Sequence, residues 1–222
     1  MMLAKLLSAL HRPIYDKRLE VLVETISPHL EPGDKVLDVG CGSGALGAAL
    51  LKANGAKNLV VHGLEKHRRG GEPIQVVPYD EKQFPFTDNS YDAVIVADVL
   101  HHEEEPEQLL RECIRVSRRL LVIKDHQITG PLAYERICLI DWAANAPYGV
   151  RCLYRYKTPQ EWSACLEHLL LEPVQRLDRM NLYPPVVNLL FGRSLQFLAI
   201  GNVSNAKSGE RGIEQTGQPS SR

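Results

Sequence analysis

Short apolar runs alternate with segments of helical apolar spacing over the first half of the chain. The runs are bounded by turn residues and predict five buried strands, at 35–39, 59–65, 74–78, 91–96 and 120–123. The helical segments between and before them are 13–30, 45–53 and 106–116. Strands that alternate with helices form right-handed crossovers. We therefore predict an α/β fold with a mostly parallel sheet and helices on both of its faces.

The pattern differs at the two ends of the chain. Leucines 3, 6, 7 and 10 have helical spacing, so residues 1–30 predict an N-terminal helical extension. Later segments predict a helix at 131–145 and a second helix that begins after Thr158, where Glu161 completes a capping box. Two late strands are predicted at 174–180 and 194–200. These strands suit an antiparallel pair at the sheet edge and bring the expected sheet to seven strands. The expected domain spans 31–202.

Two further segments differ in composition from the rest of the chain. Residues 127–160 carry aromatic and polar side chains that suit a lid over a bound substrate. Residues 203–222 contain little apolar surface, which predicts a disordered tail.

Composition narrows the class of protein. Among 222 residues, 26 Lys and Arg balance 27 Asp and Glu, so a broadly basic nucleic-acid surface is not expected. Apolar runs are shorter than the roughly 20 residues of a membrane-spanning helix, so no transmembrane segment is expected. The five cysteines are odd in number and lack C-x-x-C spacing, which favours reduced thiols in the cytoplasm. No metal-ligand spacing is present, and no metal site is expected.

A glycine-rich loop after the first strand is the strongest chemical signal. Gly40, Cys41 and Gly42 follow Asp38, at the strand end where open α/β sheets bind ligands. Residues 42–47 also match G-x-G-x-x-G, with Glu65 placed for ribose hydroxyls, so an NAD-dependent oxidoreductase stays an alternative. However, a carboxylate at position 38 repels a pyrophosphate and attracts a cation. S-adenosylmethionine, with its sulfonium, ammonium and ribose, fits this loop better.

From Val36 to Ile123 the chain resembles the class I S-adenosylmethionine-dependent methyltransferases, most closely the "type 11" group that methylates small molecules. The resemblance rests on five segments in the family's order, at 38–44, 65, 80–86, 91–102 and 109–116. It implies a Rossmann-like fold and S-adenosylmethionine as cofactor.

The resemblance also implies roles for single residues. Asp38 is expected near the methionine ammonium, with Gly40, Cys41 and Gly42 beside the methionine and ribose, and Glu65 on the ribose hydroxyls. Asp80 is expected to accept from the adenine amino group. The remaining expected cofactor residues are Tyr79, Glu81 and Asp98.

Methyl transfer from a sulfonium depends mainly on positioning, and a hydroxyl or carbon nucleophile also needs a base. His101, Asp125 and His126 follow the fourth and fifth strands, where the acceptor must enter, and are the candidate catalytic residues. The candidate substrate contacts are His102, Asp141, Trp142, Asn145 and Tyr156. The expected function is methyl transfer to a small-molecule acceptor. A non-catalytic cofactor-binding or scaffold protein is the alternative, and the sequence indicates neither the acceptor nor the oligomeric state.

Overall fold

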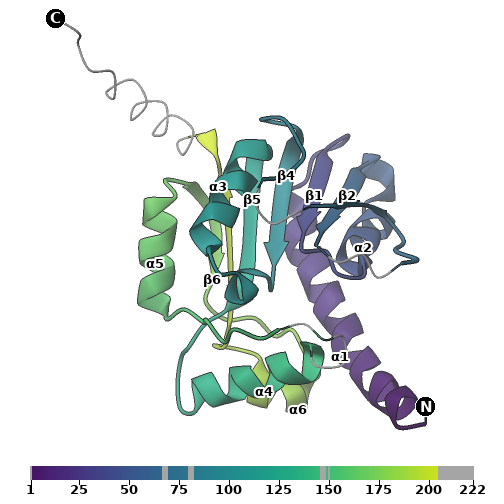
Figure 1. Ribbon diagram of the computed structural model, residues 1–222, viewed down its shortest axis with the longest axis vertical. Helices are drawn as coiled ribbons and strands as arrows, with labels where there is room; N and C mark the ends of the chain where they lie inside the picture. The colour runs from purple at the N-terminus through teal and green to yellow at the C-terminus, as the bar shows by residue number, and fades with distance from the viewer. Residues whose placement is uncertain (1, 67–69, 80–82, 146–148, 150, 205–222) are drawn as a thin grey trace, which may run out of the picture.

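A computed structural model describes residues 2–66, 70–79, 83–145, 149 and 151–204, with the backbone alone for residues 2–12. A seven-stranded sheet runs through the molecule in the order β3-β2-β1-β4-β5-β7-β6 (Figure 1). Its strands are β1 (Lys35–Val39), β2 (Val60–Glu65), β3 (Gln75–Pro78), β4 (Tyr91–Ala97), β5 (Ser117–His126), β6 (Glu172–Leu177) and β7 (Gln196–Asn202).

Strand directions agree with the predicted crossovers. The pairs β1–β2, β1–β4, β2–β3 and β4–β5 are parallel, whereas β7 is antiparallel to both β5 and β6. The predicted late antiparallel pair at the sheet edge is therefore confirmed. The chain order reverses between β1 and β4, and the carboxyl ends of these strands form the crevice where such sheets bind ligands.

Six α-helices surround the sheet in the described part of the chain: α1 (Met2–Ile26), α2 (Ala45–Ala53), α3 (Pro106–Val116), α4 (Ala133–Asn145), α5 (Pro159–His168) and α6 (Pro185–Phe191). Short 3₁₀ turns occupy Ser27–His29, Gly55–Lys57 and Leu100–His102. Helices α1 and α2 lie on one face of the sheet, and α3 and α5 lie on the other (Figure 1). Helices α4 and α6 lie side by side beyond the strand ends.

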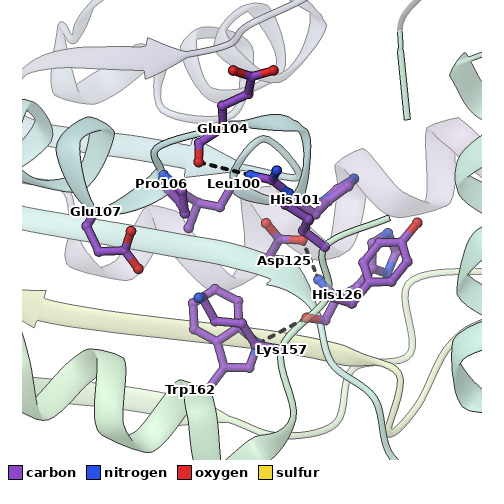
Figure 2. A pocket seen from close by; sticks show the side chains of 11 residues that line it. Leu100, His101, Glu104, Pro106, Glu107, Asp125, His126, Lys157 and Trp162 are labelled. Carbon is purple, nitrogen blue, oxygen red and sulfur yellow. Dashed lines mark hydrogen bonds and ion pairs between the residues drawn. The ribbon is translucent and has the colours of Figure 1, made fainter. Parts of the chain in front are cut away.

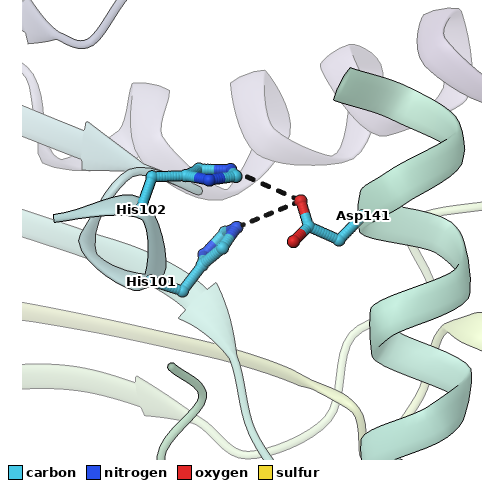
Figure 3. A group of neighbouring side chains, drawn as sticks. All are labelled: His101, His102 and Asp141. Carbon is cyan, nitrogen blue, oxygen red and sulfur yellow. Dashed lines mark ion pairs between the residues drawn. The ribbon is translucent and has the colours of Figure 1, made fainter. Parts of the chain in front are cut away.

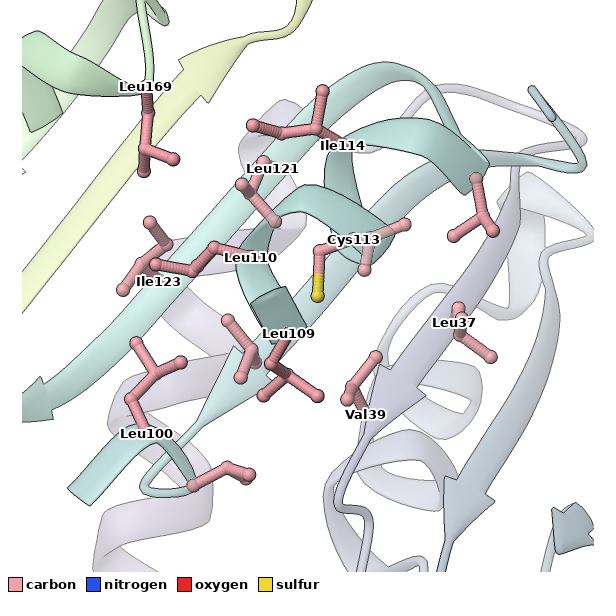
Figure 4. Packing of buried hydrophobic residues seen from close by; sticks show 14 of the residues in the cluster. Leu37, Val39, Leu100, Leu109, Leu110, Cys113, Ile114, Leu121, Ile123 and Leu169 are labelled. Atoms are coloured by element: carbon pink, nitrogen blue, oxygen red, sulfur yellow. The ribbon is translucent and has the colours of Figure 1, made fainter. Parts of the chain in front are cut away.

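Two apolar layers hold the helices on the sheet. On one face, Leu109, Leu110 and Cys113 of α3 pack over Leu37 and Ile123, as Figure 4 shows. The opposite layer joins α1 and α2 to the other side of the same strands, through Leu22, Ile26, Leu46, Leu50, Val36 and Val122. Because neighbouring strand residues point to opposite faces, both sides of each central strand are apolar. This accounts for the uninterrupted apolar runs in the sequence.

Several boundaries differ from the predicted ones. The apolar segment expected at 13–30 is part of one longer helix that includes Pro13 and ends at Ile26. Helix α6 has no counterpart among the predicted elements. Val203, the first residue of the expected tail, is fully buried and its N–H donates to the Arg119 carbonyl. Residues 205–222 of that tail lie outside the described residues.

Candidate functional site

The glycine loop after β1 has the left-handed backbone that its sequence requires. Gly40, Gly42 and Gly44 have φ values of 63°, 54° and 73°. These conformations are costly for residues with a Cβ. A Cβ on Gly40 would lie 2.5 Å from a methyl carbon of Val99. Glycine thus lets the loop pass closely over the segment that follows β4.

Glu65 holds this loop from the end of β2. Its Oε2 accepts a hydrogen bond of 2.8 Å from the backbone N–H of Gly42. A carboxylate has two oxygens and several lone pairs, so one oxygen can fix the loop while ligand hydroxyls donate to the same group. The predicted proximity of Glu65 and the glycine loop is present in the structure, while its contact with ribose stays a prediction.

The expected adenine segment is described only in part. Tyr79 packs edge-on against Phe84, with the ring centroids 5.4 Å apart. The N–H of Phe84 donates to Glu112 of α3, which fixes this aromatic pair on the third helix. Asp80 and Glu81 lie outside the described residues, so their expected roles stay predictions.

Asp38 is the buried acid at the end of β1. Its Oδ2 has no hydrogen-bond partner among the described residues. Burial raises the pKa of Asp38 to about 7, against the opposing effects of Arg18 and of the Gly47 backbone, while Glu65 raises it further. A buried carboxylate oxygen without a donor fits a cationic ligand, such as the ammonium group of S-adenosylmethionine.

The pH dependence of cofactor binding tests this role of Asp38. Only the ionised carboxylate attracts the ammonium group, so we expect affinity to rise by about tenfold per pH unit below pH 7 and to level off above it. The ligand-free folded state, by contrast, should lose stability as the pH rises toward 7, because the fold favours the protonated acid. Titration and scanning calorimetry of wild type and Asp38→Asn across this pH range measure the cofactor affinity and the stability of the ligand-free protein, respectively. If the affinity depends on pH equally in both proteins, the role assigned to Asp38 is wrong.

Replacement of Glu65 is a second test of the loop. Glu65→Ala removes the acceptor for the Gly42 N–H and the expected acceptor for the ribose hydroxyls. A hydrogen bond to a charged group contributes about 1.5–3 kcal/mol. We therefore expect cofactor binding to weaken by roughly 10- to 100-fold. Calorimetry measures the change, with Glu24→Ala on α1 as an exposed control. Unchanged affinity in Glu65→Ala would remove this residue from the site.

Asp98 follows β4 and joins two cations from distant segments. Its Oδ2 accepts from Arg18 of α1 at 2.6 Å, and its Oδ1 accepts from Lys124 of β5. Burial raises the pKa of Asp98, but Lys124 and Arg18 outweigh burial and keep it well below its ordinary value. Asp98 thus links α1 to the end of β5. Its expected contact with the cofactor stays a prediction.

His101 lies between two carboxylates. Its Nδ1 is 2.5 Å from Asp125 Oδ1, and its Nε2 is 3.5 Å from Asp141 Oδ1. Burial lowers the pKa of His101, but Asp125 and Asp141 outweigh burial and raise it to about 10. Burial raises the pKa of Asp125, but His101 outweighs burial and holds this pKa below its ordinary value. Near neutral pH this pair is therefore an imidazolium and a carboxylate, so His101 has no free lone pair to act as a base.

His126 has the opposite character. Burial together with Lys124 lowers the pKa of His126 to about 4, so its ring is neutral near pH 7. Gln196 Nε2 donates to the Phe191 carbonyl and lies 3.2 Å from His126 Nδ1. Because an amide nitrogen only donates, Nδ1 is the accepting nitrogen and Nε2 carries the proton, 3.9 Å from Asp98 Oδ1.

A cavity of about 260 Å³ opens at the ends of β4 and β5, beside this cluster (Figure 2). In Figure 2, His101, Asp125 and His126 lie on one side of it and Trp162 of α5 lies on another. Tyr156 also lines the cavity. The buried Oδ2 of Asp125 has no hydrogen-bond partner among the described residues. The cavity therefore combines aromatic walls with the buried carboxylate group of Asp125.

The five expected substrate residues divide into two groups. Asp141 and Asn145 of α4 approach His102, and Asn145 Nδ2 is 2.7 Å from Asp141 Oδ1. The Tyr156 hydroxyl donates to Asp141 Oδ2 at 2.6 Å, so that hydroxyl is held within the cluster. Trp142, in contrast, is 56% exposed on the outside of α4 and lines neither of the two cavities at this end of the sheet.

Arg18 and Gln196 are two residues of this region that the sequence pattern did not single out. Arg18 is four residues before Leu22 and eight before Ile26, on the buried stripe of α1, and a charge in that stripe is a usable signal. Gln196 lies at the start of an edge strand, and its contact with His126 spans 70 residues, so no local pattern indicates it.

In the part of the chain that the structure describes, no helix combines the length and the apolar character needed to cross a bilayer.

Comparison with known proteins finds a matching protein family and several similar sequences. A family model described as a methyltransferase domain matches residues 37–120. A demethylmenaquinone methyltransferase of Renibacterium salmoninarum is 32% identical over 107 residues, which cover 45% of each chain. A ubiquinone/menaquinone biosynthesis C-methyltransferase of Cupriavidus taiwanensis is 29% identical over 189 residues, which cover 74% of this chain and 76% of the relative. The chain thus spans just under half the length of the first of these relatives.

Among solved structures, an S-adenosylmethionine-dependent methyltransferase from Aquifex aeolicus superposes with a TM-score of 0.58 and 18% identity, over 90% of this chain and 97% of that one. This likeness concerns the fold. The strand order and the glycine loop after β1 define a Rossmann-like α/β fold. By the matched family model, residues 37–120 form a methyltransferase domain of the type 11 group, and the cofactor that the comparisons indicate is S-adenosylmethionine.

Proposed function

We propose that this protein transfers a methyl group from S-adenosylmethionine to a small-molecule acceptor bound in the cavity at the ends of β4 and β5. The observation that carries the proposal is the position of that cavity, which shares the segment after β4 with the glycine loop. Asp38, the loop glycines and Glu65 would hold the cofactor, which supplies an electrophilic methyl group when bound.

The residues of the cavity suit an acceptor with a hydroxyl group. Asp125 accepts the hydrogen bond of this hydroxyl at Oδ2 and so increases the electron density on the nucleophile. His101 keeps Asp125 ionised and fixed through the bond from Nδ1 to Oδ1. His126, with its proton on Nε2, lines the same wall and orients the acceptor. Tyr156 and Trp162 exclude water from the reacting groups.

An aromatic hydroxyl compound is the acceptor class we propose. Relatives from Renibacterium salmoninarum and Synechococcus elongatus are named for demethylmenaquinone and 2-phytyl-1,4-naphthoquinone, respectively. A reduced naphthoquinone has both a hydroxyl and a nucleophilic ring carbon, and the aromatic walls of the cavity suit its flat rings. A cytoplasmic location accords with the five cysteines, all of which are free thiols.

Binding and turnover are tested in sequence. We expect the melting temperature to rise with S-adenosylmethionine and with its demethylated product, and to stay unchanged with NAD. The protein is then incubated with methyl-labelled cofactor and either reduced 1,4-naphthoquinone or a cell extract, and products are identified by mass spectrometry. A labelled product from the extract that is not a quinol, with no product from the reduced naphthoquinone, would exclude the quinol class. Tight cofactor binding without any labelled product would favour a non-catalytic cofactor-binding protein.

A further inference from the structure

Three potential metal ligands converge beside the cavity from two distant segments. His101 and His102 come from the 3₁₀ turn after β4, and Asp141 comes from α4, some forty residues later. One ligand atom from each residue lies within 4.8 Å of the other two. Figure 3 shows both imidazole rings directed at the same carboxylate oxygen, Oδ1.

We propose that His101 Nε2, His102 Nε2 and Asp141 Oδ1 form a binding site for a divalent transition metal of the Zn²⁺ class. The inference concerns ion binding and stands whether or not methyl transfer takes place. Imidazole nitrogens with one carboxylate oxygen are a ligand set that Zn²⁺ accepts, whereas Mg²⁺ prefers oxygen ligands alone.

Two of the three separations between the ligand atoms match those around a tetrahedral ion. Asp141 Oδ1 is 3.5 Å from His101 Nε2 and 3.4 Å from His102 Nε2. A tetrahedral Zn²⁺ with bonds of about 2.0–2.1 Å places its ligand atoms about 3.3–3.4 Å apart. The two distances to Asp141 Oδ1 therefore already suit an ion. On binding, the ion displaces the proton that His101 carries on Nε2, because an imidazole nitrogen binds a metal only through a free lone pair.

Each ligand is oriented by a partner on its far side. His101 Nδ1 lies 2.5 Å from Asp125 Oδ1, and His102 Nδ1 lies 3.2 Å from the carbonyl oxygen of Arg151. A carbonyl oxygen only accepts, so His102 Nδ1 carries a proton, and Nε2 is the ring nitrogen that faces Asp141. The Tyr156 hydroxyl donates to the other oxygen of Asp141. Carboxylate and carbonyl partners of this kind are typical of histidines that bind metals.

Asn145 occupies part of the space that an ion would need. Its Nδ2 lies 2.7 Å from Asp141 Oδ1 and 3.4 Å from His102 Nε2. Ion binding therefore requires this side chain to turn its amide nitrogen away. Three protein ligands leave one tetrahedral position for water or for an oxygen of a bound molecule, as in catalytic zinc sites. The His102 side chain is 15% exposed, so the site has a route to solvent.

Titration of the full-length protein with Zn²⁺, Co²⁺ and Mg²⁺ tests the proposal by calorimetry and by melting temperature. We expect one Zn²⁺ per chain, a higher melting temperature with Zn²⁺ and no effect of Mg²⁺. Bound Co²⁺ should give the visible bands of four-coordination without the near-ultraviolet band of thiolate ligands. That last point matters because five free cysteines are an alternative source of ligands.

Variants locate the ion. His102→Ala should weaken Zn²⁺ binding by about hundredfold or more, because even residues that only orient a ligand change affinity 10- to 100-fold. His168→Ala, at an exposed histidine of α5, should bind Zn²⁺ as wild type does. Asp141→Asn should lose the Zn²⁺-dependent rise in melting temperature. The proposal is overturned if wild type binds no Zn²⁺, if His102→Ala binds it equally well, or if Co²⁺ shows thiolate ligation.

Discussion

Replacing Asp98 with asparagine is expected to lower the free energy of unfolding by about 3 kcal/mol. Asparagine keeps the shape of the side chain and tolerates the left-handed backbone at this position, where φ is 58°. It removes the negative charge that compensates Lys124, which is fully buried, and Arg18, which is largely buried. The expected loss is at the lower end for a broken buried pair, because the Asp98 side chain is 20% exposed. Urea unfolding monitored by circular dichroism measures it.

Two further variants separate the charge effect from a general loss of packing. Asp178→Asn breaks the Arg176–Asp178 pair, both of whose members are substantially exposed, and is expected to change stability by less than about 0.5 kcal/mol. Adding Lys124→Met to Asp98→Asn removes one uncompensated cation and should restore part of the lost stability. An unchanged midpoint in Asp98→Asn, or no recovery in the double variant, would show that the ion cluster does not hold α1 on the sheet.

The sequence predicted well those structural features that depend on residues close together along the chain. The apolar runs predicted the strands because both faces of the sheet are covered, and the capping box at Thr158 and Glu161 predicted the start of α5. The glycine loop and Glu65 follow adjacent parallel strands, so the topology alone brings them together.

Contacts between distant elements were not predictable in the same way. His102 and Asp141 were both named as substrate residues, but no spacing relates a turn after β4 to the face of α4, so a metal site was not expected. Trp142 was assigned to the lid by residue type, yet its position on α4 turns it to solvent. The hydroxyl of Tyr156 was expected to reach the acceptor, and the structure places it on Asp141. The positions of these side chains depend on how distant segments pack together, which the local sequence does not specify.

The structure also changes which residue we regard as the best proton acceptor. The sequence names His101, Asp125 and His126 together as candidates, and histidine is the commonest base near neutral pH. In the structure its Nδ1 accepts from Gln196 and its Nε2 carries the proton. Asp125, one residue earlier, has an ionised buried oxygen without a donor and lines the same cavity.

Asp125→Asn is therefore expected to lower kcat by about hundredfold or more, the usual contribution of a group that accepts a proton or a hydrogen bond from the nucleophile. The amide oxygen can still accept from His101 and from the backbone N–H of His126, while an NH₂ group replaces the oxygen that has no donor. Tyr156→Phe should lose only about tenfold, since it loosens Asp141 without removing a reacting group. Both variants should bind S-adenosylmethionine as wild type does, because neither position contacts the glycine loop.

His126→Ala, measured beside Asp125→Asn with the same acceptor, decides between the two residues. If Asp125 accepts from the acceptor, its variant has the lower kcat, and His126→Ala mainly raises KM through poorer orientation. If His126 is the base, His126→Ala loses the larger factor in kcat and Asp125→Asn the smaller one. His168→Ala, at an exposed position, is the control for both and should match wild type. Equal turnover in wild type, Asp125→Asn and His126→Ala would place the acceptor outside this cavity.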